Sequence, residues 1–172
     1  MSDPKTPEQR VLELGLSIPD YANPVYGGRY GMVKGFHRVG DLVLLSGVTP
    51  EDREGNRLNP GRFGVDLSIE QGYAAARLSA INALGLMRLA LGSLDEVKAI
   101  GRNLCFLRTN DDFEDLHLVS DGASELFIDV FGRAAGVAGR ASIGVASLSR
   151  GNCFELWVEL EAHPHSHPHP AT

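Results

Sequence analysis

One segment of the 172-residue chain limits the possible folds more than any other: a long helix predicted between residues 68 and 92. Ser68 followed by Gln71 has the pattern of a capping box, and Gly92 stands where a helix would end. Apolar or small residues share one face at helical spacing, namely Ala74, Leu78, Ile81, Gly85 and Leu89. Many further alanines would let this helix lie close to another surface. The sequence therefore predicts a helix packed on a β-sheet.

Shorter segments on both sides of this helix supply the sheet. Runs of apolar and alternating residues predict five strands, at residues 33–38, 42–46, 97–107, 140–148 and 153–161. A weaker second helix has Ala123, Phe127 and Val130 on one face and is predicted to end at Gly132. A short helix near the N-terminus can be capped by Thr6 and stopped by Gly15.

The order of these elements, ββαβαββ after the short N-terminal helix, indicates the fold class. Helices separated by single strands favour a mixed sheet with both helices on one face, which is an α+β fold. We expect residues 1–162 to form a single domain. The sheet face without helices would carry Trp157 and Cys153, which a monomer would leave exposed.

Composition restricts the partners and the location of the protein. A net charge of -6 and a pI of about 5.5 remove the global basic field that attracts nucleic acid. The N-terminus lacks the apolar stretch of a signal peptide, and no apolar run approaches the ~18 residues of a membrane span. We therefore expect a cytoplasmic protein. Cys105 and Cys153 lie in apolar runs without metal-site spacing, which predicts buried, reduced thiols.

The segment 163–172 contains the run HPHSHPHP. Alternating proline excludes a helix and favours an extended, solvated tail. Histidines on a mobile chain make no closed, pre-formed metal site. We expect a disordered tail and no metal site in the protein, and weak adventitious metal binding by this tail is the alternative.

Two charged residues stand out in the closing strands. Arg140 opens a strand that is otherwise small and apolar. The last strand alternates, with Phe154, Leu156, Val158 and Leu160 on one face and Cys153, Glu155, Trp157, Glu159 and Glu161 on the other. A charge on a strand costs little where that face meets water and much where the face is covered, so Arg140 and Glu155 are informative.

The chain resembles the Rid/YjgF superfamily of reactive intermediate deaminases, also called L-PSP endoribonucleases, in its longer branch with an added N-terminal helix. The resemblance rests on the order and spacing of LELGLSIP, DLVLLSG, QGYAAARLSAINAL, LGSLDEV, DGASELFIDVFG and the closing arginine and glutamate. It implies a chorismate-mutase-like fold and a homotrimer with ligand clefts between subunits. It also implies cofactor-independent hydrolysis of 2-imino acids, or their enamine tautomers, to 2-keto acids and ammonia.

The resemblance also implies roles for particular residues. The family arginine that grips the substrate carboxylate matches Arg140, and the family glutamate that positions water matches Glu155. A tyrosine of the early loop matches Tyr30, although Tyr21 and Tyr26 lie in the same loop. The Ser-Gly pair ending the second strand is Ser46 and Gly47. Three further positions depart from the archetypes: Ser142 replaces a frequent cysteine, and Asp121 and Ser124 are both candidates for a family asparagine.

The residues themselves support this chemistry. A guanidinium presents paired N–H donors that fit a carboxylate, so Arg140 is a plausible anchor for a small 2-oxo or 2-imino acid. A carboxylate such as Glu155 can position water and transfer protons. In the alternative interpretation both residues form structural ion pairs, with Glu159 and Glu161 as partners of Arg140. Ser142 would line the cleft or only allow close packing.

Geometry adds a separate inference about the site. If the last two strands form a hairpin turning at residues 149–152, Arg140 and Glu155 lie on the order of 15–20 Å apart along the sheet. They would then serve different purposes, or a neighbouring subunit would complete the site. Three functions follow: an imine or enamine hydrolase, a keto-acid-binding regulatory module without turnover, and a ribonuclease. The acidic charge and the absence of an aromatic RNA-stacking motif disfavour the ribonuclease.

Overall fold

A five-stranded sheet with the strand order β1-β2-β5-β3-β4 forms the base of the molecule. The computed structural model describes residues 5–22 and 33–164. The strands are β1 (Phe36–Val39), β2 (Leu42–Leu45), β3 (Val97–Arg108), β4 (Gly139–Val145) and β5 (Phe154–Ala162). β3 and β4 run parallel and the other neighbouring pairs run antiparallel. The sheet is therefore mixed, as predicted.

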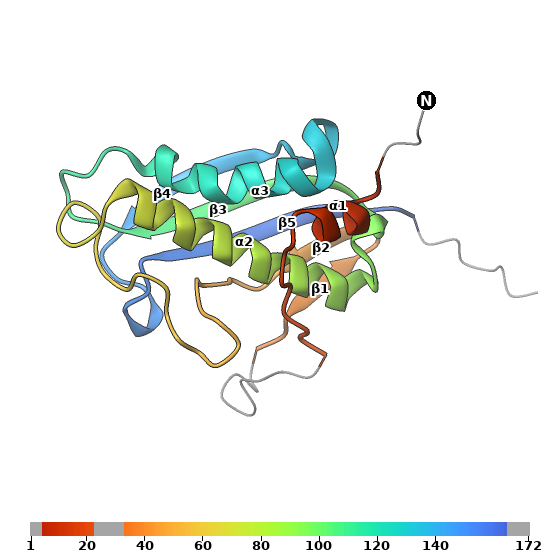
Figure 1. Cartoon of the computed structure of the whole chain (residues 1–172), viewed down its shortest axis with the longest axis horizontal. Helices are drawn as coiled ribbons and strands as arrows, with labels where there is room; N and C mark the ends of the chain where they lie inside the picture. The colour runs from red at the N-terminus through yellow and green to blue at the C-terminus, as the bar shows by residue number, and fades with distance from the viewer. Residues whose placement is uncertain (1–4, 23–32, 165–172) are drawn as a thin grey trace, which may run out of the picture.

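The helices lie on one face of this sheet (Figure 1). They are α1 (Pro7–Glu13), α2 (Ile69–Leu91) and α3 (Leu116–Gly136), with the short 3₁₀ turns η2 (Leu94–Glu96) and η3 (Ser149–Gly151). α2 and α3 pack against each other and against the central strands β5 and β3, and the core fills the space between these layers. The predicted α+β architecture and the element order are confirmed. The other face of the sheet is called here the open face, and none of the helices within residues 5–22 and 33–164 covers it.

α2 begins and ends as its sequence predicts. The Ser68 hydroxyl accepts a hydrogen bond from the backbone N–H of Gln71, whose side chain accepts one from the N–H of Ser68. Gly92 ends the helix with φ +84°, a conformation that favours glycine. The predicted buried face was wrong, because Ala74 and Leu89 are exposed. α2 contacts both the sheet and α3, so its buried arc is wider and includes Ala75, Ala76, Ser79, Ala80, Ala83, Leu84 and Met87.

α2 is also more apolar than the sequence analysis expected. It contains an 18-residue window with a mean hydropathy of 1.2, which suffices by length and composition to cross a membrane. However, 56% of this window is buried inside the molecule. Because its small and apolar residues face the sheet and α3, α2 has the character of a core helix of a globular domain.

α3 is interrupted where the sequence predicts its end. Gly132 has the non-helical angles φ +77° and ψ 165°, and a further helical stretch follows to Gly136. Beside this kink, Arg10 of α1 donates a hydrogen bond of 3.4 Å to the carbonyl of Val130. α1 is thereby fixed against α3, and its predicted cap Thr6 is confirmed by a capping box with Gln9.

Both cysteines are unpaired and buried, as predicted. Burial raises the pKa of the Cys105 thiol to about 11 and that of Cys153 to about 12. The expected exposure of Cys153 on the open face was wrong. The loop between β2 and α2 covers it, with the carbonyl of Leu58 lying 4.0 Å from its sulfur. Trp157 does remain 48% exposed there.

Two predictions concern residues that the structure does not describe. Tyr30 and the His/Pro tail from residue 165 onward lie outside the described ranges.

Candidate functional site

A cleft of about 960 Å³ lies at the end of β2, between this strand, the loop that follows it and β5. Three of the predicted site residues line this cleft together: Ser46, Gly47 and Glu155. The wall is mostly apolar, with Phe36, Leu44 and Leu86 among its residues. An apolar cleft with a few convergent polar groups is the usual form of a small-molecule site.

Ser46 and Gly47 shape one wall of the cleft. The Ser46 hydroxyl donates a hydrogen bond to the carbonyl of Lys34, which ties the end of β2 to the residues before β1. A Cβ on Gly47 would overlap the Glu155 carboxylate and lie 2.5 Å from Nε1 of Trp157. The backbone therefore approaches these two side chains so closely that a larger residue at position 47 would displace the Glu155 carboxylate or the Trp157 indole.

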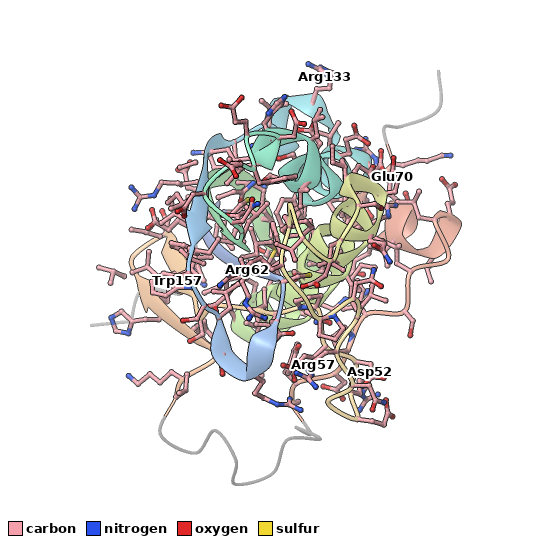
Figure 2. All side chains as sticks on the ribbon, turned by 90° about the vertical axis from the view of Figure 1, so that its left-hand side faces the viewer. Asp52, Arg57, Arg62, Glu70, Arg133 and Trp157 are labelled. Carbon is pink, nitrogen blue, oxygen red and sulfur yellow. The ribbon has the colours of Figure 1, made fainter. Side chains whose placement is uncertain are left out.

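The Glu155 carboxylate has a fixed orientation within the cleft. Nε1 of Trp157 donates a hydrogen bond of 2.8 Å to Oε1 of Glu155, and both side chains project from the same face of β5. Figure 2 shows Trp157 on the side of the sheet that faces away from the helices. The sequence analysis placed Trp157 on the open face but did not anticipate this bond.

A buried polar network closes one end of the cleft. Glu51 is 4% exposed, accepts a 2.7 Å hydrogen bond from Nδ2 of Asn152 and forms an ion pair with Arg150. Asn82 of α2 donates 2.9 Å hydrogen bonds to the carbonyls of Thr49 and Glu51. In the sequence, Glu51 lies in a polar segment rich in turn-forming residues. No local pattern indicated that its carboxylate is buried, because its partners are about a hundred residues away.

Arg140 lies elsewhere, on β4 beneath α3. Its Nη1 donates to Oδ1 of Asp121 at 2.7 Å and to the hydroxyl of Ser124 at 2.9 Å. Its Nη2 donates to the carbonyl of His117 at 3.4 Å. The two candidates for the family asparagine therefore both contact the arginine. The Arg140 guanidinium is held in one orientation before any ligand binds.

The alternative interpretation, a structural ion pair of Arg140, named the wrong partners: Arg140 pairs with Asp121 and not with Glu159 or Glu161. These two glutamates form ion pairs with Arg102 and Lys98 on the open face. The reason is strand alternation: residues 159 and 161 project from the open face of β5, whereas Arg140 contacts α3 on the covered face.

Ser142 lies next to Arg140 on the same face of β4. Its hydroxyl donates a 2.8 Å hydrogen bond to the hydroxyl of Ser120 on α3, and Ser120 donates in turn to the carbonyl of Leu116. This placement joins β4 to α3 beside the arginine. Among the described site candidates, the structure therefore forms two groups: one of Arg140, Asp121, Ser124 and Ser142, and one of Ser46, Gly47 and Glu155.

The two groups lie on opposite faces of the sheet. The predicted hairpin of the last two strands was wrong, because β3 lies between β4 and β5 and pairs with both. Arg140 is opposite Asn103 of β3, and Glu155 is opposite Phe106. Three residues along a strand and two strand spacings place their Cα atoms about 14 Å apart. One small ligand cannot contact both side chains within one chain.

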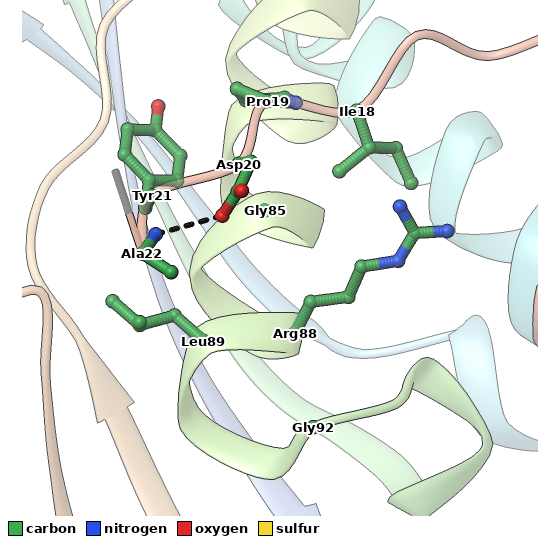
Figure 3. Close-up of a pocket in the computed structure, with 9 residues that line it drawn as sticks. All are labelled: Ile18, Pro19, Asp20, Tyr21, Ala22, Gly85, Arg88, Leu89 and Gly92. Carbon is green, nitrogen blue, oxygen red and sulfur yellow. Dashed lines mark hydrogen bonds between the residues drawn. The ribbon is translucent and has the colours of Figure 1, made fainter. Parts of the chain in front are cut away.

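A second, smaller hollow of about 270 Å³ lies between residues 18–22 and α2 (Figure 3). There, Gly85 allows the chain to cross α2 closely, since a Cβ on it would lie 2.6 Å from the carbonyl of Pro19. Arg88 is already engaged by Glu8 through a 3.1 Å bond from Nε. This hollow is a packing feature where the N-terminal segment meets α2.

Comparisons with known proteins identify the fold and its family. Residues 8–148 match the family described as YjgF/chorismate mutase-like, putative endoribonuclease. The chain is 32% identical over 151 residues to Protein TCP17 of Trypanosoma cruzi, covering 88% of this chain and 91% of that protein. The chain belongs to the YjgF/chorismate mutase-like family.

Solved structures of this family agree with the fold. A putative endoribonuclease from Shewanella oneidensis MR-1 is 29% identical with a TM-score of 0.82, covering 91% of this chain and 99% of that one. Atu1372 from Agrobacterium tumefaciens, a protein of unknown function, is also 29% identical, with a TM-score of 0.79 over 91% and 92% of the two chains. The YjgF gene product of E. coli shares the fold at a TM-score of 0.55 and 20% identity, over 77% and 89% of the two chains.

Proposed function

We propose that this YjgF-family protein hydrolyses small reactive 2-imino acids, or their enamine tautomers, to 2-keto acids and ammonia. The observation that carries the proposal is an oriented carboxylate, Glu155, in a largely apolar cleft in which none of the lining residues that the structure describes is an arginine. A positioned guanidinium, Arg140, is presented on the other side of the sheet. The two groups supply the functions that imine hydrolysis needs, which are an anion anchor and a proton carrier.

Arg140 would bind the substrate carboxylate. Asp121 and Ser124 occupy Nη1, which fixes the plane of the guanidinium and leaves further N–H donors for a ligand. An anchor oriented in advance loses less side-chain entropy when it binds.

Glu155 would position the attacking water. The carboxylate removes a proton from water while the water oxygen bonds to the imine carbon, and this proton passes to the nitrogen, giving a tetrahedral carbinolamine. The carboxylate then takes the proton of the new hydroxyl group and delivers it to the nitrogen, the carbon–nitrogen bond breaks, and ammonia leaves as the carbonyl forms. No electron acceptor is needed, because the reaction is a hydrolysis.

The substrate cleft would be completed by a second subunit of a homotrimer. Because Arg140 and Glu155 face opposite sides of one sheet, only Arg140 of a neighbouring chain can approach Glu155. The open face also exposes apolar side chains that an interface would cover, namely Val39, Leu42, Ile143 and Trp157.

The assembly itself gives the first expected result. Light scattering at micromolar protein concentration should give three times the 18.5 kDa subunit mass. A particle with the mass of one subunit would contradict the trimer and the shared cleft together.

The activity is tested by ammonia release. Imino acids are generated in situ from several amino acids by an amino acid oxidase, and the protein should accelerate the appearance of ammonia over the spontaneous rate, independently of salt. Binding of keto acids without acceleration would indicate a regulatory binding module. Cleavage of RNA, weakened by salt, would indicate a ribonuclease instead.

Arg140 and Asp121 should change ligand affinity in opposite directions. Arg140→Ala should weaken pyruvate binding about 30-fold or more, because a bidentate, charged anchor is lost. Asp121→Asn keeps an acceptor for Arg140 but removes a negative charge beside the ligand carboxylate, so it should tighten binding about threefold to tenfold. Calorimetry measures both. If both variants bind pyruvate as tightly as the wild type but melt at a lower temperature, the contact between Arg140 and Asp121 is a structural ion pair.

A further inference from the structure

The contact between Trp157 and Glu155 is unusual for a half-exposed tryptophan. The Trp157 side chain is 48% exposed, yet its single N–H donates to the carboxylate at 2.8 Å instead of to solvent. The two residues stand two positions apart on β5, so their side chains share the open face. Local alternation therefore builds the pair without any help from a distant segment.

Two neighbours hold the indole in place. The ring of Phe106 meets it edge-on, with centroids 5.9 Å apart and planes at 66°. On the other side the backbone of Gly47 leaves no space for a Cβ beside Nε1. A backbone bridge between Val48 and Leu156 fixes that close approach. The indole is therefore confined on both sides, and its N–H has a fixed direction.

We propose that Trp157 is a positioning residue that orients the Glu155 carboxylate for its reaction with water, an inference that rests on the proposed hydrolase function. The indole N–H occupies Oε1 and leaves Oε2 free for the water or the substrate nitrogen. A neutral donor stabilises the ionised carboxylate without neutralising it. A proton carrier needs this ionised form to accept a proton from water.

Other charged groups lie near Glu155 and Trp157. The cleft also contains Lys34, His37 and Glu51. The open face carries the ion pair of Arg102 with Glu159, and Arg108 projects from the same face of β3 as Phe106. His37 is the control for the test below, because it lines the same cleft as Glu155 and Trp157.

Trp157 is the single tryptophan of the 172-residue chain, which makes the contact directly observable. Glu155→Gln should change the emission spectrum of the folded protein, because the indole N–H loses an ionised acceptor. His37→Gln should leave the spectrum unchanged. A spectrum that changes in His37→Gln but not in Glu155→Gln would overturn the assignment of the contact.

Turnover tests the positioning role. Trp157→Phe keeps an aromatic ring and removes the N–H, so kcat should fall about tenfold to hundredfold while the melting temperature stays within a few degrees. Trp157→His restores a ring N–H and should recover part of the loss. An unchanged kcat, or equal losses in both variants, would reject the role.

The two readouts separate this inference from the function on which it rests. If the wild-type protein releases no ammonia but the emission of Trp157 changes in Glu155→Gln, the hydrolase proposal fails while the contact stands. If ammonia is released and Trp157→Phe retains full kcat, the hydrolase proposal stands and the role of Trp157 fails.

Discussion

Mixing Arg140→Ala chains with Glu155→Ala chains is expected to restore activity that neither variant has alone. Each variant lacks one of the two groups in every cleft, so each should be inactive. In a mixed trimer some clefts combine an intact Arg140 from one chain with an intact Glu155 from the next. Random assembly of equal amounts should leave about a quarter of the clefts complete. Ammonia release by the refolded mixture should therefore approach that fraction of the wild-type rate.

A matched mixture controls for effects of refolding. A mixture of Arg140→Ala chains with the double variant Arg140→Ala, Glu155→Ala has no Arg140 in any chain. It should remain inactive at every ratio. Native mass spectrometry confirms that subunits have exchanged. If exchanged mixtures of the two single variants show no recovery, Arg140 and Glu155 do not meet across an interface. That result would reject the shared cleft and the proposed role of Glu155.

Gly122→Ala should be the most destabilising small substitution in the helix layer. A Cβ at this position of α3 would overlap the backbone carbonyl of Tyr73 in α2 and lie 3.0 Å from its carbonyl carbon. Backbone atoms cannot move aside by changing a rotamer, so the two helices would have to separate. We expect the free energy of unfolding to fall by about 3 kcal/mol, measured by urea denaturation. This loss would exceed the gain in helix propensity from alanine.

Gly139→Ala is the matched control for this effect. Gly139 opens β4, and a Cβ there would meet only the carbonyl oxygen of Gly101 at 3.5 Å, an ordinary contact. Its stability should change by less than about 0.5 kcal/mol. Equal stabilities of Gly122→Ala and wild type would mean that α2 and α3 can separate freely, contrary to their close packing.

The parts of the fold that depend on local sequence were predictable. Ser68 with Gln71 and the terminal Gly92 define α2 because capping bonds and a left-handed end involve only neighbouring residues. The alternation of β5 likewise identified its buried face. Gly132 also marked the break in α3, because a glycine with positive φ interrupts a helix locally. The further helical stretch to Gly136 and the contact between Arg10 and Val130 were not predicted, because Arg10 is distant in sequence.

The candidate site was predictable only as a set of residues. Ser46, Gly47 and Glu155 do meet, and Asp121 and Ser124 do contact Arg140. Their division into two groups could not be derived, because it depends on β3 lying between β4 and β5. Sequence adjacency favours a hairpin at that point, and only the packing of α3 over β4 decides otherwise.

The separation of Arg140 and Glu155 by a single sheet has a consequence for regulation. In the proposed assembly, a dissociated chain keeps both Arg140 and Glu155 but has no complete cleft. A dissociated chain would therefore be inactive until it joins a trimer. Dilution would then lower the activity per chain, and the specific activity would rise steeply with protein abundance until trimers saturate. A cell could therefore switch the enzyme on by making more of it, without any effector molecule.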